Sequence, residues 1–172
     1  FKDRGKRTND GLAIMKKLWV EAKPSHQSDN FSFENVEKGP KPVQTPHLPI
    51  YIGGNSPAAM RRTAQFADAW HPFKITPEML AEARPVLNSA LEEAGRLTDD
   101  FPIAPKIALT FQDGPAGAGQ APSEGRPQDI IDTLRRFRDA GATEFCFDIM
   151  TETLPVMLDT MERFAQEVRD KV

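Results

Sequence analysis

The segment 49–60 restricts the possible folds of this chain more than any other, because it reads as a strand, a tight turn and a helix start in immediate succession. The apolar run Ile50-Tyr51-Ile52 is typical of a short buried strand. The pair Gly53-Gly54 ends it, and Asn55-Ser56 offers two good N-cap residues. Pro57 suits the first position of a helix. We therefore predict a strand that passes through a glycine turn into a capped helix.

Such a junction points unpaired backbone N–H groups and the positive end of a helix dipole at one place, which favours a phosphate. A glycine pair also lets an anion approach the backbone closely. The same residues are equally common in an ordinary tight turn. The pair Gly53-Gly54 is not a Gly-x-Gly-x-x-Gly fingerprint, and no P-loop lysine follows it. A phosphate site and a plain turn both remain open at this point.

Strand and helix patterns alternate along the rest of the chain. We expect strands centred near residues 51, 70, 107 and 147, with helices at about 8–19, 57–66, 76–94, 127–140 and 154–168. Alternation of this kind predicts right-handed crossovers and a parallel sheet. A complete eight-stranded barrel takes roughly 250 residues. The fold class is therefore α/β, either four strand–helix units of a partial TIM-like barrel or a small open sheet with helices on both faces.

Composition excludes several classes of function. The net charge is −3, and no basic stripe with interleaved aromatic residues occurs, so we expect no nucleic-acid partner. No apolar run is long enough to cross a membrane. A single cysteine and three histidines make a structural zinc site improbable and favour a reducing, cytoplasmic setting.

We expect one domain over residues 1–172, with an irregular excursion at 21–48 and a mobile, low-complexity loop at 112–125. Because the chain opens at Phe1 without a methionine, we expect it to be the middle of a longer protein.

Five segments together resemble the C-terminal half of the bacterial luciferase-like family. They are Phe1-x-x-Arg-Gly-x-Arg7, the run Pro40-Lys-Pro-Val-Gln44 followed by Pro49-Ile-Tyr-Ile-Gly-Gly54, Asp68-Ala-Trp-His-Pro72, Ala94-Gly95-Arg96 and Asp139-Ala-Gly-Ala142. That family contains flavin-dependent monooxygenases and deazaflavin-dependent oxidoreductases, and its fold is a TIM barrel. This chain has Ala69 where the family usually has Gly, and Arg126 where it usually has Ser or Thr. The family's first four strands, which carry its usual acid or base, have no counterpart here, so we assign no catalytic residue.

The resemblance implies a flavin-type cofactor, FMN or an 8-hydroxy-5-deazaflavin coenzyme, whose phosphate lies beside the glycine turn. It also implies a small-molecule substrate. Four strands alone would leave two open edges and a bare sheet face, so we also expect a homodimer. The candidate cofactor-binding residues are Gly53, Gly54, Asn55, Ser56, Trp70 and His71. The alternative is a non-catalytic half-barrel module that dimerises through exposed sheet edges.

Two of these candidates, His71 and Trp70, and two further residues are more easily explained by structure than by chemistry. We expect His71 to form a hydrogen-bonded wall of the site, although a proton donor there is possible. Trp70 is expected to pack rather than to stack on a ring. Asp148 lies between apolar residues and should be paired with an Arg, a Lys or the backbone. Cys146, between two phenylalanines, is expected to be a small core residue.

Overall fold

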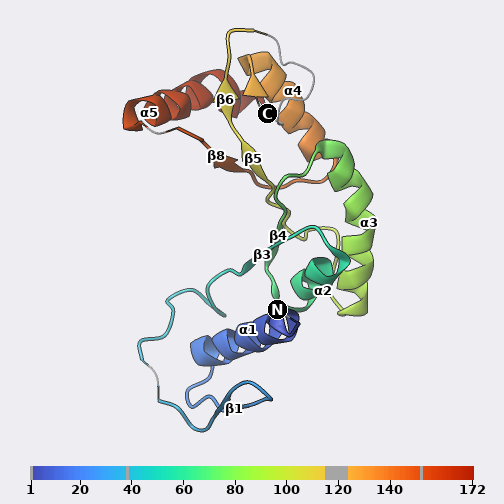
Figure 1. Cartoon of the computed structure of the whole chain (residues 1–172), viewed down its shortest axis with the longest axis vertical. Helices are drawn as coiled ribbons and strands as arrows, with labels where there is room; N and C mark the ends of the chain where they lie inside the picture. The colour runs from blue at the N-terminus through green and yellow to red at the C-terminus, as the bar shows by residue number, and fades with distance from the viewer. Residues whose placement is uncertain (1, 38, 115–123, 152) are drawn as a thin grey trace.

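A computed structural model describes residues 2–37, 39–114, 124–151 and 153–172 as an α/β structure (Figure 1). The helices are α1 (Arg4–Val20), α2 (Pro57–Phe66), α3 (Pro77–Glu93), α4 (Pro127–Asp139) and α5 (Leu154–Arg163), the last continuing as a π turn (Phe164–Val168) and a 3-10 turn (Arg169–Lys171). The strands are β1 (His26–Gln27), β2 (Ser32–Phe33), β3 (Tyr51–Gly53), β4 (Ala69–His71), β5 (Lys106–Ala108), β6 (Thr110–Phe111), β7 (Glu124–Gly125) and β8 (Cys146–Asp148).

The central strands run parallel, as the alternation of strands and helices predicts. β3 pairs with β4, β5 with β8, and β6 with β7, each pair in parallel. Two isolated parallel bridges, Trp70–Ile103 and Phe73–Lys106, join β4 to the segment that enters β5. The resulting order is β3, β4, β5, β8, and these strands form no closed barrel within the described part of the chain. The partial barrel therefore stays a prediction.

Helices α2, α3 and α4 lie on one side of these strands (Figure 1). Each strand alternates its side chains, so every second residue faces those helices. Trp70, Ile107, Leu87, Leu134 and Phe137 are almost fully buried in one apolar cluster between strands and helices. Burial of this cluster is the main stabilising contribution to the fold.

Local sequence signals explain where α2 and α3 begin. Ser56 Oγ accepts a hydrogen bond from the Ala59 N–H at 3.2 Å, and Thr76 Oγ1 accepts one from the Met79 N–H at 3.2 Å. Each cap satisfies one of the N–H groups that a helix start leaves without a partner. Both helices carry a proline in the first turn, and for Pro57 this was predicted.

The first helix begins earlier than predicted. It starts at Arg4 rather than near Thr8, whose hydroxyl donates to the Arg4 carbonyl at 2.8 Å inside the helix. A threonine can bond the carbonyl one turn back as readily as it can cap, so its identity alone does not locate a helix start.

The C-terminal elements also differ from the prediction. The strand expected at 103–111 is split into β5 and β6, and β6 pairs with β7, which lies inside the segment predicted to be a mobile loop. The rest of that loop, 115–123, is outside the described residues. The last helix leaves apolar side chains outside the core, since Leu154 and Met161 are 65% and 53% exposed.

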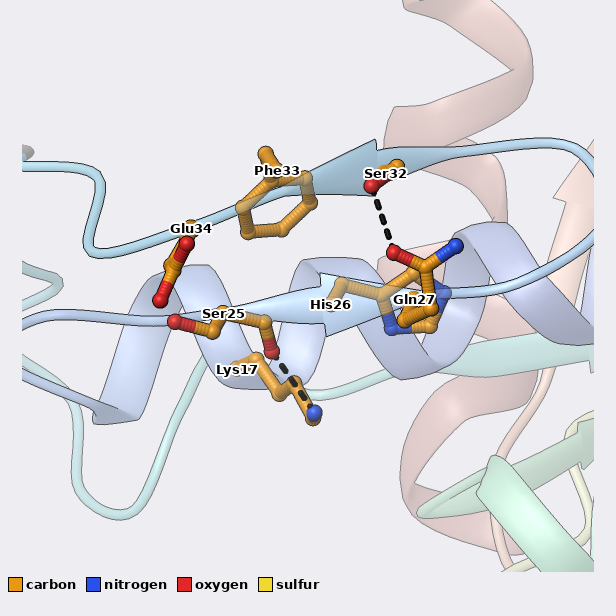
Figure 2. A pocket seen from close by; sticks show the side chains of 7 residues that line it. All are labelled: Lys17, Ser25, His26, Gln27, Ser32, Phe33 and Glu34. Atoms are coloured by element: carbon orange, nitrogen blue, oxygen red, sulfur yellow. Dashed lines mark hydrogen bonds between the residues drawn. The ribbon is translucent and has the colours of Figure 1, made fainter.

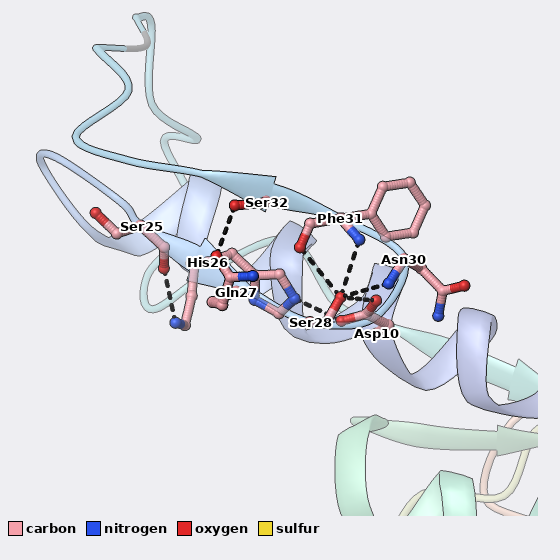
Figure 3. Close-up of polar contacts among 9 residues, drawn as sticks. Asp10, Ser25, His26, Gln27, Ser28, Asn30, Phe31 and Ser32 are labelled. Atoms are coloured by element: carbon pink, nitrogen blue, oxygen red, sulfur yellow. Dashed lines mark hydrogen bonds and ion pairs between the residues drawn. The ribbon is translucent and has the colours of Figure 1, made fainter.

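The excursion at 21–48 contains an antiparallel hairpin, β1–β2, anchored on α1. The Asp10 carboxylate of α1 accepts hydrogen bonds from His26 Nε2 at 2.5 Å and from the Ser28 hydroxyl at 2.6 Å (Figure 3). Lys17 Nζ donates to the Ser25 carbonyl at 2.8 Å, beside a pocket of about 550 Å³ (Figure 2). Near the end of this segment, Lys41 Nζ donates a hydrogen bond to the Leu18 carbonyl of α1 at 2.8 Å.

Candidate functional site

The glycine turn lies where β3 ends and α2 begins. Gly54 has φ +97°, in the left-handed region that favours glycine, and a Cβ built on it would lie 3.1 Å from the Ala59 Cβ. Among the described residues, the backbone N–H groups of Asn55 and Ala58 have no hydrogen-bond partner. The turn and the first residue of α2 are exposed to solvent. This arrangement offers backbone donors and a helix N-terminus to an anion.

Two side chains hold the turn in place. Trp70 is fully buried beneath it, and its Nε1–H donates to the Gly54 carbonyl at 2.9 Å. Asn55 Nδ2 donates to the Phe73 carbonyl at 2.8 Å, which ties the turn to the segment that follows β4. Trp70 therefore packs below the turn, as expected, and presents no ring face to the outside.

His71 ends β4 directly beside the turn, because its register partner in β3 is Gly53. Its Nδ1 lies 2.6 Å from the Ala104 carbonyl oxygen. The ring also meets the edge of Tyr51, with 6.3 Å between ring centroids. All six candidate residues from the sequence thus lie at or below one turn, five of them at least partly accessible and Trp70 buried.

The strand face opposite α2, α3 and α4 is called here the open face. Its residues include the buried Ala69 and seven that are exposed or half-buried: Tyr51, Gly53, His71, Lys106, Ala108, Cys146 and Asp148. Tyr51 donates its hydroxyl to Glu144 Oε2 at 2.7 Å across this face, and that bond raises the pKa of Tyr51. The open face is therefore polar and accessible.

The expectation that Cys146 is a core residue was wrong, since Cys146 is exposed. It shares the open face with Asp148, while Phe147 between them packs toward the apolar cluster. Strand alternation explains the error: flanking phenylalanines in a strand point away from the residue between them. The expected partner of Asp148 is present, because Lys106 Nζ lies 2.8 Å from its Oδ2.

An apolar pocket of about 470 Å³ lies at the carboxyl ends of β4, β5 and β8. Phe73, Ile75 and Met150 supply much of its apolar lining, and the Lys106–Asp148 pair lies at its side. Lys106 Nζ also lies 5.3 Å from the Phe73 ring centroid. The hydrogen bond to Asp148 is the main cause that raises the pKa of Lys106.

Sequence reasoning did not single out Phe73 or Lys106. The signal that could have found Phe73 is its place just after a strand end, where α/β proteins build their ligand sites. Lys106 could have been found as the charged residue that alternates with the buried Ile107.

Within the described ranges, no group of three or more His, Cys, Asp or Glu side chains could hold a metal ion. No helix of those ranges is both long and apolar enough to cross a membrane.

A family model described as "Luciferase-like monooxygenase" matches residues 1–121. The chain belongs to this family. Membership agrees with the resemblance found in the sequence segments around the glycine turn. The family model ends before α4, so the last helices lie beyond the match.

Two curated luciferase-like relatives illustrate the range of the family. An F420-dependent glucose-6-phosphate dehydrogenase from Microbacterium testaceum (strain StLB037) is 27% identical over 111 residues, 63% of this chain and 32% of the relative. An FMNH(2)-dependent dimethylsulfone monooxygenase from Pseudomonas putida is 30% identical over 69 residues, 40% of this chain and 19% of the relative. Each match thus spans less than two thirds of the relative's own length.

The fold of the chain resembles that of solved luciferase-like enzymes. An F420-dependent secondary alcohol dehydrogenase in complex with an F420-acetone adduct superposes with a TM-score of 0.81 and 16% identity. The match covers 98% of this chain and 63% of that enzyme. At this identity the likeness describes the fold, and the chain again spans less than two thirds of its neighbour.

Proposed function

We propose that this chain is the phosphate-binding part of a flavin- or deazaflavin-dependent oxidoreductase. The observation that carries the proposal is the left-handed Gly54 turn, with backbone donors of Asn55 and Ala58 left free among the described residues. Membership in the luciferase-like family supports a flavin-type ligand for that turn. Relatives named for F420 and for FMNH(2) leave the choice between the two cofactor classes open.

The turn fits a phosphate on its own geometry. A side chain at Gly54 would crowd the Ala59 side chain and would strain the backbone at φ +97°, so the turn keeps this shape only with glycine. The backbone N–H groups of Asn55 and Ala58, which are free among the described residues, and the Ser56 hydroxyl would hold the phosphate oxygens. Ser56 Oγ already accepts from Ala59 N–H, and its own proton remains available for donation.

The bound ring would supply the hydride or oxygen chemistry, and this chain would supply binding and position. The turn lies at the carboxyl end of β3, and the pocket beside Phe73 opens at the carboxyl ends of the neighbouring strands. In the proposed partial barrel, this is the end at which ligands bind. On the open face, Tyr51 donates its hydroxyl to Glu144. This bond supports a role for that face in positioning the cofactor rather than in proton transfer.

The first test is a fluorescence titration of the chain with FMN, with riboflavin and, separately, with a deazaflavin coenzyme. We expect saturable FMN binding that weakens at least about tenfold without the phosphate, because hydrogen bonds to a charged group contribute about 1.5–3 kcal/mol each. Equal affinity for FMN and riboflavin would contradict the assignment of the turn as a phosphate site.

Gly54→Val should abolish that preference for FMN over riboflavin, because it crowds the Ala59 side chain and strains the backbone at φ +97°. Gly95→Val is the matched control. Gly95 also has a positive φ, +70°, but its Cβ would meet nothing within 4 Å and it follows α3, away from the turn. Gly95→Val should lower stability as Gly54→Val does and leave FMN binding unchanged.

A further inference from the structure

One nitrogen of His71 is committed to the protein and the other is not. A carbonyl oxygen only accepts hydrogen bonds, so the 2.6 Å contact with Ala104 requires a proton on Nδ1. In the neutral imidazole this leaves Nε2 as the acceptor nitrogen. No residue of the described ranges gives Nε2 a hydrogen-bond partner. The neutral ring is thus fixed in the tautomer with the proton on Nδ1, and Nε2 can accept a hydrogen bond from a ligand.

The surroundings of His71 leave room for a ligand. His71 is half-buried on the open face, and its neighbour in β3 is Gly53, which has no side chain. A Cβ on Gly53 would lie 3.3 Å from the His71 carbonyl oxygen, so this row of the sheet is tightly built. The edge of Tyr51 holds the imidazole from one side, and Tyr51 is itself held by Glu144. The position of the ring is therefore set by two contacts, with the Ala104 carbonyl and with the Tyr51 ring.

The distance from the glycine turn also suits a ligand contact. Adjacent strands lie about 4.8 Å apart, so a group bound at the turn after Gly53 has its next few atoms beside β4. FMN and deazaflavin coenzymes both attach their phosphate to a polyol chain that bears hydroxyl groups. A ligand whose phosphate lies at Asn55 would bring those hydroxyls to the end of β4, where His71 lies.

We propose that His71 Nε2 accepts a hydrogen bond from a hydroxyl group of a phosphorylated polyol chain, and so helps to select the cofactor. This inference rests on the proposed function, because it takes the turn as the phosphate site. It assigns His71 a binding role and leaves the ring chemistry to other groups.

The test uses His71→Asn and two phosphorylated flavins. Asparagine keeps an N–H near the position of Nδ1 for the Ala104 carbonyl but lacks the acceptor at Nε2. The ligands are FMN and a flavin with a phosphopentyl chain, which has the phosphate and no hydroxyls. We expect the wild-type chain to bind FMN about 3- to 10-fold more tightly than the phosphopentyl flavin, the usual worth of one hydrogen bond. His71→Asn should remove that preference and leave phosphopentyl-flavin affinity nearly unchanged.

His47→Asn is the matched control. Its Nδ1 lies 2.8 Å from the Leu48 carbonyl oxygen, but it precedes β3 and contacts Trp19 rather than the open face. It should leave both affinities unchanged.

The inference is overturned if His71→Asn weakens both ligands equally, or if it changes neither. A failure of the proposed function looks different, because the wild-type chain would then bind riboflavin as tightly as FMN. Absence of FMN binding to the wild-type chain would overturn both.

Discussion

At the scale of single residues, the candidate site depends on side chains that hold the backbone. Trp70 has no exposed surface, and its indole N–H satisfies the Gly54 carbonyl from below. The Asn55 side chain holds the turn from the side by donating a hydrogen bond to the Phe73 carbonyl. Because backbone donors bind the anion in the proposed site, these supporting bonds decide whether the donors converge.

Trp70→Phe should therefore lower the free energy of unfolding by about 1–3 kcal/mol, since it removes a buried hydrogen bond and leaves a small cavity. It should also weaken FMN binding by loosening the turn. Trp19→Phe is the control, because the Trp19 ring contacts His47 and its indole nitrogen makes no hydrogen bond to the described residues. Denaturant unfolding and the FMN titration give the two readouts. Equal losses in both variants would contradict a special role for the Trp70 bond.

At the scale of elements, the β1–β2 hairpin is attached to α1 largely by one carboxylate. Asp10 accepts from Ser28 and from His26, whose side chain is 11% exposed, as is that of Asp10. The Ser28 hydroxyl is the largest cause that lowers the pKa of Asp10. Ser28 Oγ in turn accepts the N–H groups of Asn30 and Phe31, so the carboxylate orders the whole hairpin turn (Figure 3).

The sign of the pH dependence follows from that lowered pKa. A carboxyl group whose pKa is lower in the folded state stabilises it above its usual pKa of 3.8, and this contribution is lost as the pH falls through the folded value. We expect the Asn30 and Phe31 amides to lose their protection against hydrogen exchange only when the pH falls below the lowered pKa of Asp10. Protection here is the exchange rate compared with that of an unfolded chain at the same pH. Asp10→Asn should show the same loss of protection at pH 7. Asp29→Asn, exposed in the same turn, should not.

At the scale of the whole molecule, the described part of the chain leaves a strand face and apolar side chains of α5 exposed. The open face carries Tyr51, Lys106 and Asp148, and α5 exposes Leu154 and Leu158 to 65% and 54%. Figure 1 shows α5 and α1 projecting to the same side of the strands, with the strands between them. Apolar and edge surfaces of this kind favour association with another set of strands.

We expect the isolated chain to associate with itself as its concentration rises, which sedimentation velocity or light scattering would measure. Leu154→Glu with Leu158→Glu should shift the equilibrium toward the monomer, because both side chains are more than half exposed in the folded chain. Val43→Glu is a control, since Val43 is 99% exposed in the loop before β3 and far from α5 in sequence. A monomer at every concentration would speak against the dimer, including the non-catalytic dimeric module.

Features coded by neighbouring residues were predictable from the sequence. The turn at Gly53-Gly54, the bounds of α2 and the cap Ser56 all follow from residues within a few positions of each other. The family could also be recognised, because its most specific segment surrounds the same turn. The sequence therefore places the candidate site at this turn, and that placement stays a prediction until cofactor binding is measured.

Local pattern alone determined the α/β class, the parallel pairing and the glycine turn, because backbone sterics and capping act over a few residues. Only the tertiary structure decided that Cys146 is exposed, that Asp10 anchors a hairpin beginning sixteen residues later, and that His71 keeps one nitrogen free. Each of these depends on a partner brought close by the fold: Phe147 turned to the core, α1 beside β1, and the Ala104 carbonyl beside β4. The physical reason is that burial and tautomer depend on contacts between distant segments, which no local pattern contains.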